Sequence, residues 1–159
     1  MNIQHHVATI MQPNINDCWA AATAMAMRGH SDAGTQHVKN LAAAAGVPLD
    51  NGTLPDSSVL LLAQAVHFWF HRFPDGREVT LDQLAALLVR GPVVAFGFFS
   101  IPSLHDSVKH AVTIFALIGD GTDRGTTIKL IDPAATINPF TDDFEHFMSK
   151  SDINFLRSY

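Results

Sequence analysis

The sequence is poor in charged residues and in cysteine. Of its 159 residues, 16% are charged and one is a cysteine, whereas 47% are hydrophobic. A single cysteine cannot form an internal disulfide, which excludes a disulfide-rich secreted scaffold and favours a reducing compartment such as the cytosol. The high share of hydrophobic residues is typical of a globular chain with a sizeable core and excludes a disordered one.

Basic residues are also scarce, and long hydrophobic runs are absent. Lys and Arg number 10 against 15 Asp and Glu, so the formal net charge is −5 at pH 7. A nucleic-acid-binding surface needs a stripe of positive charge, and we therefore expect no nucleic-acid partner. The apolar runs at 59–66 and 93–99 are far shorter than the roughly 20 residues of a transmembrane helix. The N-terminus lacks a basic start followed by an apolar run, so we expect neither a signal peptide nor membrane insertion.

Predicted helices fill the first part of the chain and predicted strands the second. Runs of helix-forming residues end at glycine or proline, and the later runs are rich in β-branched and aromatic residues. The predicted helices cover 18–27, 35–45, 59–66, 80–89 and, as a short helix, 140–148. The predicted strands cover 67–71 (followed by a turn at 74–76), 93–99, 111–118, 126–131 and 154–156. This order indicates an α+β fold with N-terminal helices packed on a C-terminal antiparallel sheet, and the length fits one domain spanning 1–159.

The only cysteine, Cys18, falls at the predicted start of the first helix. Asn16 and Asp17 are the candidates for the N-cap. Unpaired N–H groups and the positive end of the helix dipole at this position lower the pKa of a thiol and favour the nucleophilic thiolate. The alternative is that Cys18 is a small buried hydrophobic residue, which most single cysteines are.

Candidates for a catalytic base and for the acid that orients it lie far downstream of Cys18. His110 directly precedes the apolar run A-V-T-I-F, and Asp132 ends the next strand in L-I-D-P. Because adjacent antiparallel strands place the start of one beside the end of the other, the Asp132 carboxylate can orient the His110 ring. Gln12 can donate its amide beside the Cys18 N–H to form an oxyanion hole, and Trp19 can form a wall of the substrate cleft. In the alternative, Asp132 is a turn residue and Gln12 a surface loop residue.

The stretch Q-P-N-I-N-D-C-W-A-A resembles the nucleophile segment of papain-like cysteine peptidases, in which a Gln lies six residues before the Cys. With H-A-V-T-I and I-D-P, it looks more like a bacterial branch of that clan, which includes double-glycine leader peptidase domains and papain-like effector proteases. The resemblance implies that Cys18 is the nucleophile, His110 the base, Asp132 the orienting acid and Gln12 the oxyanion donor. The chain differs from leader peptidase domains, which usually have Gly where it has Trp19, and from plant and animal papains, which have Asn where it has Asp132.

The resemblance implies a cysteine endopeptidase that hydrolyses peptide bonds in protein or peptide substrates, with small residues such as glycine near the cleaved bond. It also suggests an effector toxin, delivered without a signal peptide into a target cell and neutralised by an immunity protein in the producing cell. Two alternatives stay open: an amidase, deamidase, transglutaminase or other acyltransferase with the same triad, and an inactive binding module. We expect no metal and no cofactor, because the segment around His67 and His71 alternates like a strand and no third ligand lies nearby.

Overall fold

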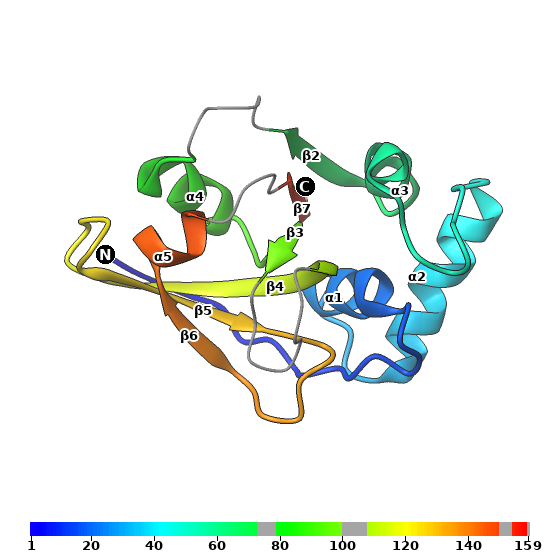
Figure 1. The fold of residues 1–159 in the computed structure, drawn as a ribbon, viewed down its shortest axis with the longest axis horizontal. Helices are drawn as coiled ribbons and strands as arrows, with labels where there is room; N and C mark the ends of the chain where they lie inside the picture. Colours follow the sequence, from blue (N-terminus) through cyan, green and yellow to red (C-terminus); the bar gives the residue numbers. More distant parts are fainter. Residues whose placement is uncertain (73–78, 100–107, 150–153, 159) are drawn as a thin grey trace.

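A computed structural model describes residues 1–72, 79–99, 108–149 and 154–158, and it shows the predicted α+β architecture (Figure 1). The α-helices are α1 (Cys18–Ala26), α2 (Asp32–Ala44), α3 (Val59–Ala65), α4 (Leu81–Leu88) and α5 (Phe144–Met148), and a 3₁₀ helix at Asp56–Ser58 leads into α3. The strands are β1 (Asn2–Gln4), β2 (Phe68–Arg72), β3 (Val93–Phe99), β4 (Val108–Gly119), β5 (Thr126–Ile131), β6 (Phe140–Asp143) and β7 (Asn154–Ser158).

The strands form one antiparallel sheet in the order β2-β7-β3-β4-β5-β6, and β1 pairs with the far end of β4. Val93 of β3 lies opposite Ile114 of β4, and Thr113 of β4 lies opposite Ile131 of β5. The start of β4 therefore lies beside the end of β5. This arrangement brings together the two strand ends that carry His110 and Asp132.

Two hydrophobic cores lie on opposite faces of the sheet. Along β3, Val94 and Phe96 belong to a first core formed with α1, α2 and α3, whereas Val93 and Ala95 belong to a second core formed with α4 and α5. This alternation is expected because successive side chains of a strand point to opposite faces. Figure 1 shows α1, α2 and α3 at one end of the molecule and α4 and α5 at the other.

Helix α1 is buried along almost its whole length. Every residue from Trp19 to Ala26 is buried, and most of them are alanine, so α1 can pack closely against its neighbours. On the α2 side, a Cβ added to Gly34 would lie 3.4 Å from the Cβ of Ala24. On the sheet side, the Thr113 hydroxyl donates a 2.9 Å hydrogen bond to the Ala22 carbonyl. The helix that begins with Cys18 is thus held against the strand that carries His110.

The hydrogen bond from Thr113 should contribute measurably to stability. Thr113 is fully buried. The substitution Thr113→Val removes its hydroxyl donor and keeps the branched shape of the side chain. We expect the free energy of unfolding to fall by about 1 kcal/mol, the usual net contribution of such a bond. Urea denaturation measures the change, with the exposed control Thr122→Val expected to have a smaller effect. An unchanged denaturation midpoint for Thr113→Val would show that this bond does not stabilise the packing of α1.

Two predictions about elements require correction. Helix α2 begins at Asp32, before the predicted Thr35, because Ser31 adopts an extended N-cap conformation. The helix predicted at 140–148 is wrong in its first half, because Phe140–Asp143 pairs with β5 as an edge strand and only Phe144–Met148 is helical. The strand predicted at 154–156 is present as β7, which lies between β2 and β3 inside the sheet. The turn predicted at 74–76 lies outside the described residues.

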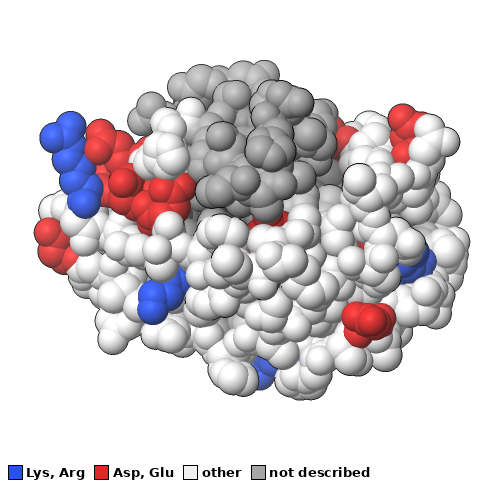
Figure 2. Space-filling view, turned by 60° about the horizontal axis from the view of Figure 1, so that its bottom comes forward, with Lys and Arg blue, Asp and Glu red and all other residues white. Residues whose placement is uncertain are grey.

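Charged side chains are sparse on the face of the molecule drawn in Figure 2, in agreement with the low content of charged residues. In the face drawn in Figure 2, Lys and Arg side chains of the described residues are few and lie apart, with broad uncharged areas between them. Among the helices that the structure describes, none has the length and apolar character needed to cross a bilayer.

Candidate active site

Cys18 is the first residue of α1 and is half-buried. The first N–H groups of an α-helix have no partner within the helix, so the Cys18 N–H is geometrically suited to bind an anion. The Asp17 carbonyl accepts hydrogen bonds from the N–H groups of Ala20 and Ala21, both at 3.0 Å, which fixes the first turn. The sulfur is therefore attached to a rigid helix end.

His110 and Asp132 form a buried pair beside this helix end. The Nε2 atom of His110 lies 2.5 Å from Oδ1 of Asp132, and the two residues are 7% and 0% exposed. Oδ1 of Asp132 also accepts a 2.8 Å hydrogen bond from the Ala134 N–H. Because an ionised carboxylate only accepts hydrogen bonds, Nε2 of His110 carries a proton, and the other ring nitrogen is left to interact with the Cys18 thiol.

The environment of His110 favours its protonated form. Burial opposes protonation, but hydrogen bonds to Asp132 and Cys18, together with the negative charges of these two residues, outweigh it and raise the pKa of His110 from 6.5 to about 9. The imidazole is therefore protonated at neutral pH. A protonated ring between a carboxylate and a sulfur can stabilise a thiolate and deliver a proton to a leaving group.

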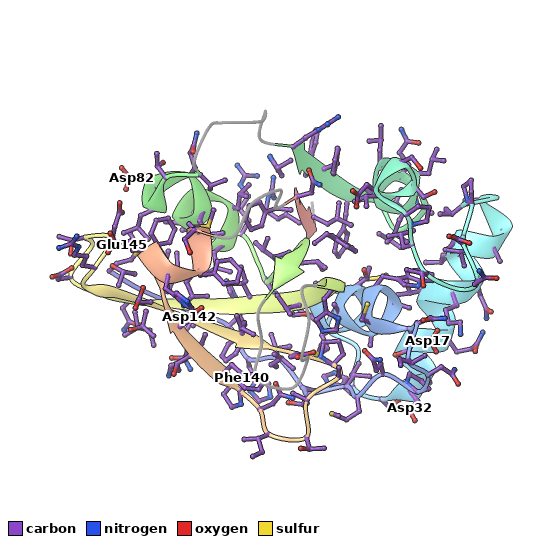
Figure 3. The ribbon with its side chains drawn as sticks, in the orientation of Figure 1. Asp17, Asp32, Asp82, Phe140, Asp142 and Glu145 are labelled. Carbon is purple, nitrogen blue, oxygen red and sulfur yellow. The ribbon has the colours of Figure 1, made fainter. Side chains whose placement is uncertain are left out.

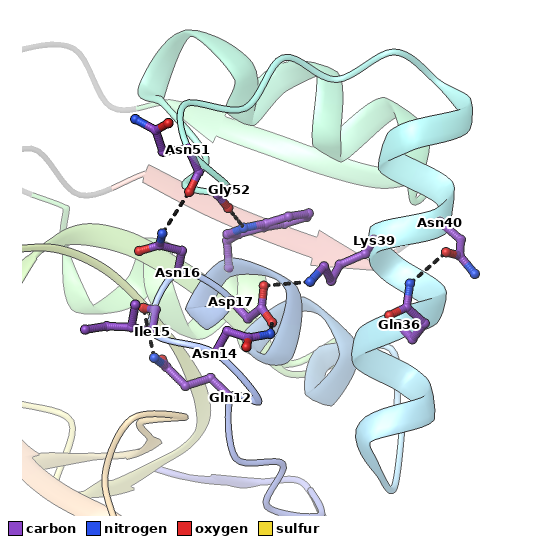
Figure 4. A network of polar contacts seen from close by, with 11 residues as sticks. Gln12, Asn14, Ile15, Asn16, Asp17, Gln36, Lys39, Asn40, Asn51 and Gly52 are labelled. Carbon is purple, nitrogen blue, oxygen red and sulfur yellow. Dashed lines mark hydrogen bonds and ion pairs between the residues drawn. The ribbon is translucent and has the colours of Figure 1, made fainter.

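A second polar network holds the segment that precedes Cys18 (Figure 4). Asp17 is the N-cap residue of α1, as predicted, but its side chain does not cap the helix. Instead, its carboxylate accepts a 2.8 Å hydrogen bond from Asn14 and forms a 2.9 Å ion pair with Lys39 of α2. Asp17 is 4% exposed, so the charge of Lys39 compensates a buried carboxylate. Lys39 could not be predicted as the partner of Asp17, because no local sequence pattern connects the two residues.

Gln12 joins the nucleophile segment to the segment that carries Asp132. Its main-chain N–H donates a 2.8 Å hydrogen bond to the Pro133 carbonyl. Its side-chain amide donates to the Ile15 carbonyl at 3.0 Å. A primary amide has two N–H donors, so one donor of Gln12 is used within its own loop and the amide has a second one. The predicted oxyanion role of Gln12 stays a prediction.

A small pocket opens between the helix end and the sheet. Cys18, His110 and Trp19 line it together with residues of the loop before α3 and of β3 and β4, which are Thr53, Leu54, Asp56, Phe96, Gly97 and Ala111. The indole N–H of Trp19 donates a 3.0 Å hydrogen bond to the Gly52 carbonyl, which fixes this wall. The cavity volume is about 30 Å³, enough for about two water molecules. The structure thus places Trp19 at the pocket, and it adds Leu54 and Phe96, which the sequence did not predict.

The acidic residues labelled in Figure 3 lie toward the two ends of the molecule. Asp32 lies near Asp17 at the α1–α2 side, whereas Asp82, Asp142 and Glu145 lie around α4 and α5 at the other end of the molecule. Within the described part of the chain, no three His, Cys, Asp or Glu side chains are grouped so that they could hold a metal ion.

Comparison with known proteins defines the class of fold. No protein-family profile and no curated protein matches the sequence. Solved structures similar to this chain are C39 peptidase structures, and the papain-like α+β fold predicted from the sequence is thereby confirmed.

The first of these structures is the peptidase domain of Streptococcus ComA, a bi-functional ABC transporter involved in a quorum-sensing pathway. It shares 12% of its residues with this chain, covers 97% of this chain and 100% of its own length, and has a TM-score of 0.61. The second, from Bacillus anthracis, is described as a C39-like peptidase, with 12% identity, full coverage of both chains and a TM-score of 0.52. At this identity the likeness shows the fold alone.

Proposed function

We propose that this protein is a cysteine endopeptidase in which Cys18, His110 and Asp132 form the catalytic triad. The observation that carries the proposal is the buried His110–Asp132 pair, placed against a cysteine at the first residue of a helix. The papain-like fold of the similar structures supports it, and the three residues lie at the start of α1, near the start of β4 and directly after the end of β5. Cys18 and His110 both line the same pocket, through which a substrate can reach them.

In the proposed reaction, the Cys18 thiolate attacks the carbonyl carbon of a peptide bond and the π electrons move to the oxygen. The Cys18 N–H and the Gln12 amide would donate hydrogen bonds to this oxyanion. The His110 imidazolium gives its proton to the nitrogen of the breaking C–N bond, which leaves as an amine and leaves a thioester on the sulfur. Water then attacks the thioester while His110 accepts a proton, the C–S bond breaks, and the acid product leaves.

The walls of the pocket support a preference for small residues at the cleaved bond. Beside Cys18 and His110 the pocket is lined by the bulky apolar side chains of Trp19, Leu54 and Phe96. Trp19 is 1% and Phe96 8% exposed, so both are held in place by packing and neither can swing aside easily. We therefore propose glycine or alanine next to the scissile bond, in keeping with the resemblance to peptidases that act at such residues.

The proposal is tested by giving the purified protein two kinds of substrate, a denatured bacterial proteome and isolated peptidoglycan. We expect new protein N-termini, detected by mass spectrometry, that follow small residues and that are absent when the protein has first been treated with iodoacetamide. Release of muropeptides without new protein N-termini would instead identify a cell-wall amidase. Absence of both products would favour a binding module. Delivery as an effector, with a matching immunity protein, stays a prediction from the sequence resemblance.

A further inference from the structure

The side chain of Asn138, in the loop that follows Asp132, bonds back to the main chain of that residue. Asn138 accepts a 3.0 Å hydrogen bond from the Asp132 N–H through its amide oxygen and donates a 3.0 Å hydrogen bond to the Asp132 carbonyl through its amide nitrogen. The same nitrogen also donates to the Ala135 carbonyl at 2.8 Å. The amide of Asn138 is thus bonded to both main-chain polar groups of one residue.

These bonds are made at the residue directly after the last paired residue of β5. Strand β5 ends at Ile131, and the pairing between β4 and β5 reaches only to Thr113 and Ile131. The next residue, Pro133, has no N–H to donate. A side-chain amide that bonds one N–H and one carbonyl reproduces the pattern of an antiparallel partner strand. Asn138 therefore extends the ordered backbone by one residue beyond the end of β5.

The residue held in this way is the one whose carboxylate meets His110. The described contacts of Asp132 include its main-chain bonds to Asn138, the Ala135 N–H on its carbonyl, the Ala134 N–H on Oδ1, and His110 on the same carboxylate oxygen. Asp132 is completely buried, so its carboxylate has no water to replace a lost protein partner. A small rotation of the main chain at Asp132 would move Oδ1 away from Nε2 of His110.

We propose that Asn138 is a positioning residue of the active site, which acts through Asp132 by holding that residue's main chain so that its carboxylate meets His110. The effect on cleavage rests on the proposed peptidase function, whereas the effect on His110 does not. Asn138 touches neither the sulfur nor the imidazole in the described contacts, so it is not itself a catalytic residue.

The test compares Asn138→Ala with the milder Asn138→Gln, which keeps the amide but displaces it by one methylene. The control is Asn40→Ala, which removes an exposed amide bonded to Gln36 on α2. The pKa of His110 is measured by NMR, with its signals assigned by their loss in His110→Gln, since the chain has 9 histidines. Cleavage rates are expressed per folded molecule after the folded fraction has been measured by circular dichroism.

For Asn138→Ala we expect the pKa of His110 to fall toward its value in Asp132→Asn. We also expect kcat to fall about tenfold with KM little changed, because a displaced catalytic group lowers the rate of the chemical step. Asn138→Gln should give intermediate values and serves as the readout if the alanine variant does not fold. In the Asp132→Asn background, Asn138→Ala should cause no further loss, since residues that act through one group are not additive.

Wild-type values of kcat and of the His110 pKa in Asn138→Ala would overturn the inference. An equal tenfold loss in the Asp132→Asn background would overturn it as well, since Asn138 would then act by another route. A wild-type protein that cleaves nothing would contradict the proposed function instead. In that event, the pKa of His110 in the same variants still decides the role of Asn138.

Discussion

Replacement of Cys18 by alanine is expected to abolish cleavage while the protein stays folded. The sulfur is the atom that forms the covalent bond with the substrate, so no residual path through His110 remains. Removing the nucleophile of a related triad lowers kcat by about 10⁶-fold, and we expect a loss of at least about 10⁴-fold here. Cys18 is half-buried at a helix end, so its truncation should change the free energy of unfolding by less than about 1 kcal/mol.

Two measurements check this prediction. Cleavage of a peptide that contains the identified site gives kcat/KM, and mass spectrometry counts the iodoacetamide groups added at neutral pH. The wild type should take up one group, because the chain has one cysteine, and Cys18→Ala none. Gln36→Ala, an exposed change on α2, is the control and should keep wild-type activity. Cleavage by purified Cys18→Ala at one tenth of the wild-type rate would exclude Cys18 as the nucleophile.

The second large effect is expected for Asp132→Asn. The substitution keeps the shape of the side chain but removes its negative charge, and the new amide can donate to Nε2 of His110, which favours the wrong tautomer. The corresponding change costs a serine protease about 10⁴-fold in kcat. We expect a smaller loss, about a hundredfold, because sulfur is intrinsically a stronger nucleophile than a hydroxyl and depends less on activation by a base.

The same substitution should change the pH dependence of activity and of stability. The unfolded chain releases the His110 proton near pH 6.5, whereas the folded protein holds it with a pKa of about 9. The stabilisation from this proton is therefore complete below about pH 6.5 and is lost as the pH rises through about 9, and it amounts to about 3 kcal/mol. Without the Asp132 charge and hydrogen bond, the pKa of His110 falls, so this loss of stability becomes smaller.

Urea denaturation at pH 6.5 and at pH 9 measures that difference for both proteins. The free energy of unfolding of the wild type should fall more between the two pH values than that of Asp132→Asn. Activity of the wild type should decline above about pH 9, where His110 loses the proton that the leaving amine needs, and the decline should move to lower pH in the variant. If both proteins lose activity over the same pH range, Asp132 does not control the protonation of His110.

The parts of the fold that follow from local patterns were predictable from the sequence. The alanine-rich run after Cys18 is helical within one or two residues of the prediction, and β3 and β5 have the predicted bounds. Pairing between β4 and β5 follows from two consecutive strands joined by the glycine-rich loop at 119–125. For this reason His110 and Asp132, 22 residues apart, could be placed together before their distance was known.

The parts that depend on distant partners were not predictable in this way. Phe140, Phe144 and Phe147 have the spacing of a helix face, yet 140–143 pairs with β5, and Asp143 then caps the shortened α5. Asp17 has the sequence position of a helix cap, but a lysine of α2 and an asparagine of the preceding turn hold its carboxylate. In both cases a contact formed only in the folded chain outweighs the local preference.

The single, half-exposed sulfur beside a protonated imidazole has a consequence for how the protein tolerates peroxide. An accessible thiolate is converted readily to sulfenic acid, which many proteins rescue by condensation with a neighbouring thiol. This chain contains no second cysteine. Recovery from such damage therefore depends on a small-molecule thiol such as glutathione reaching the narrow opening beside Trp19.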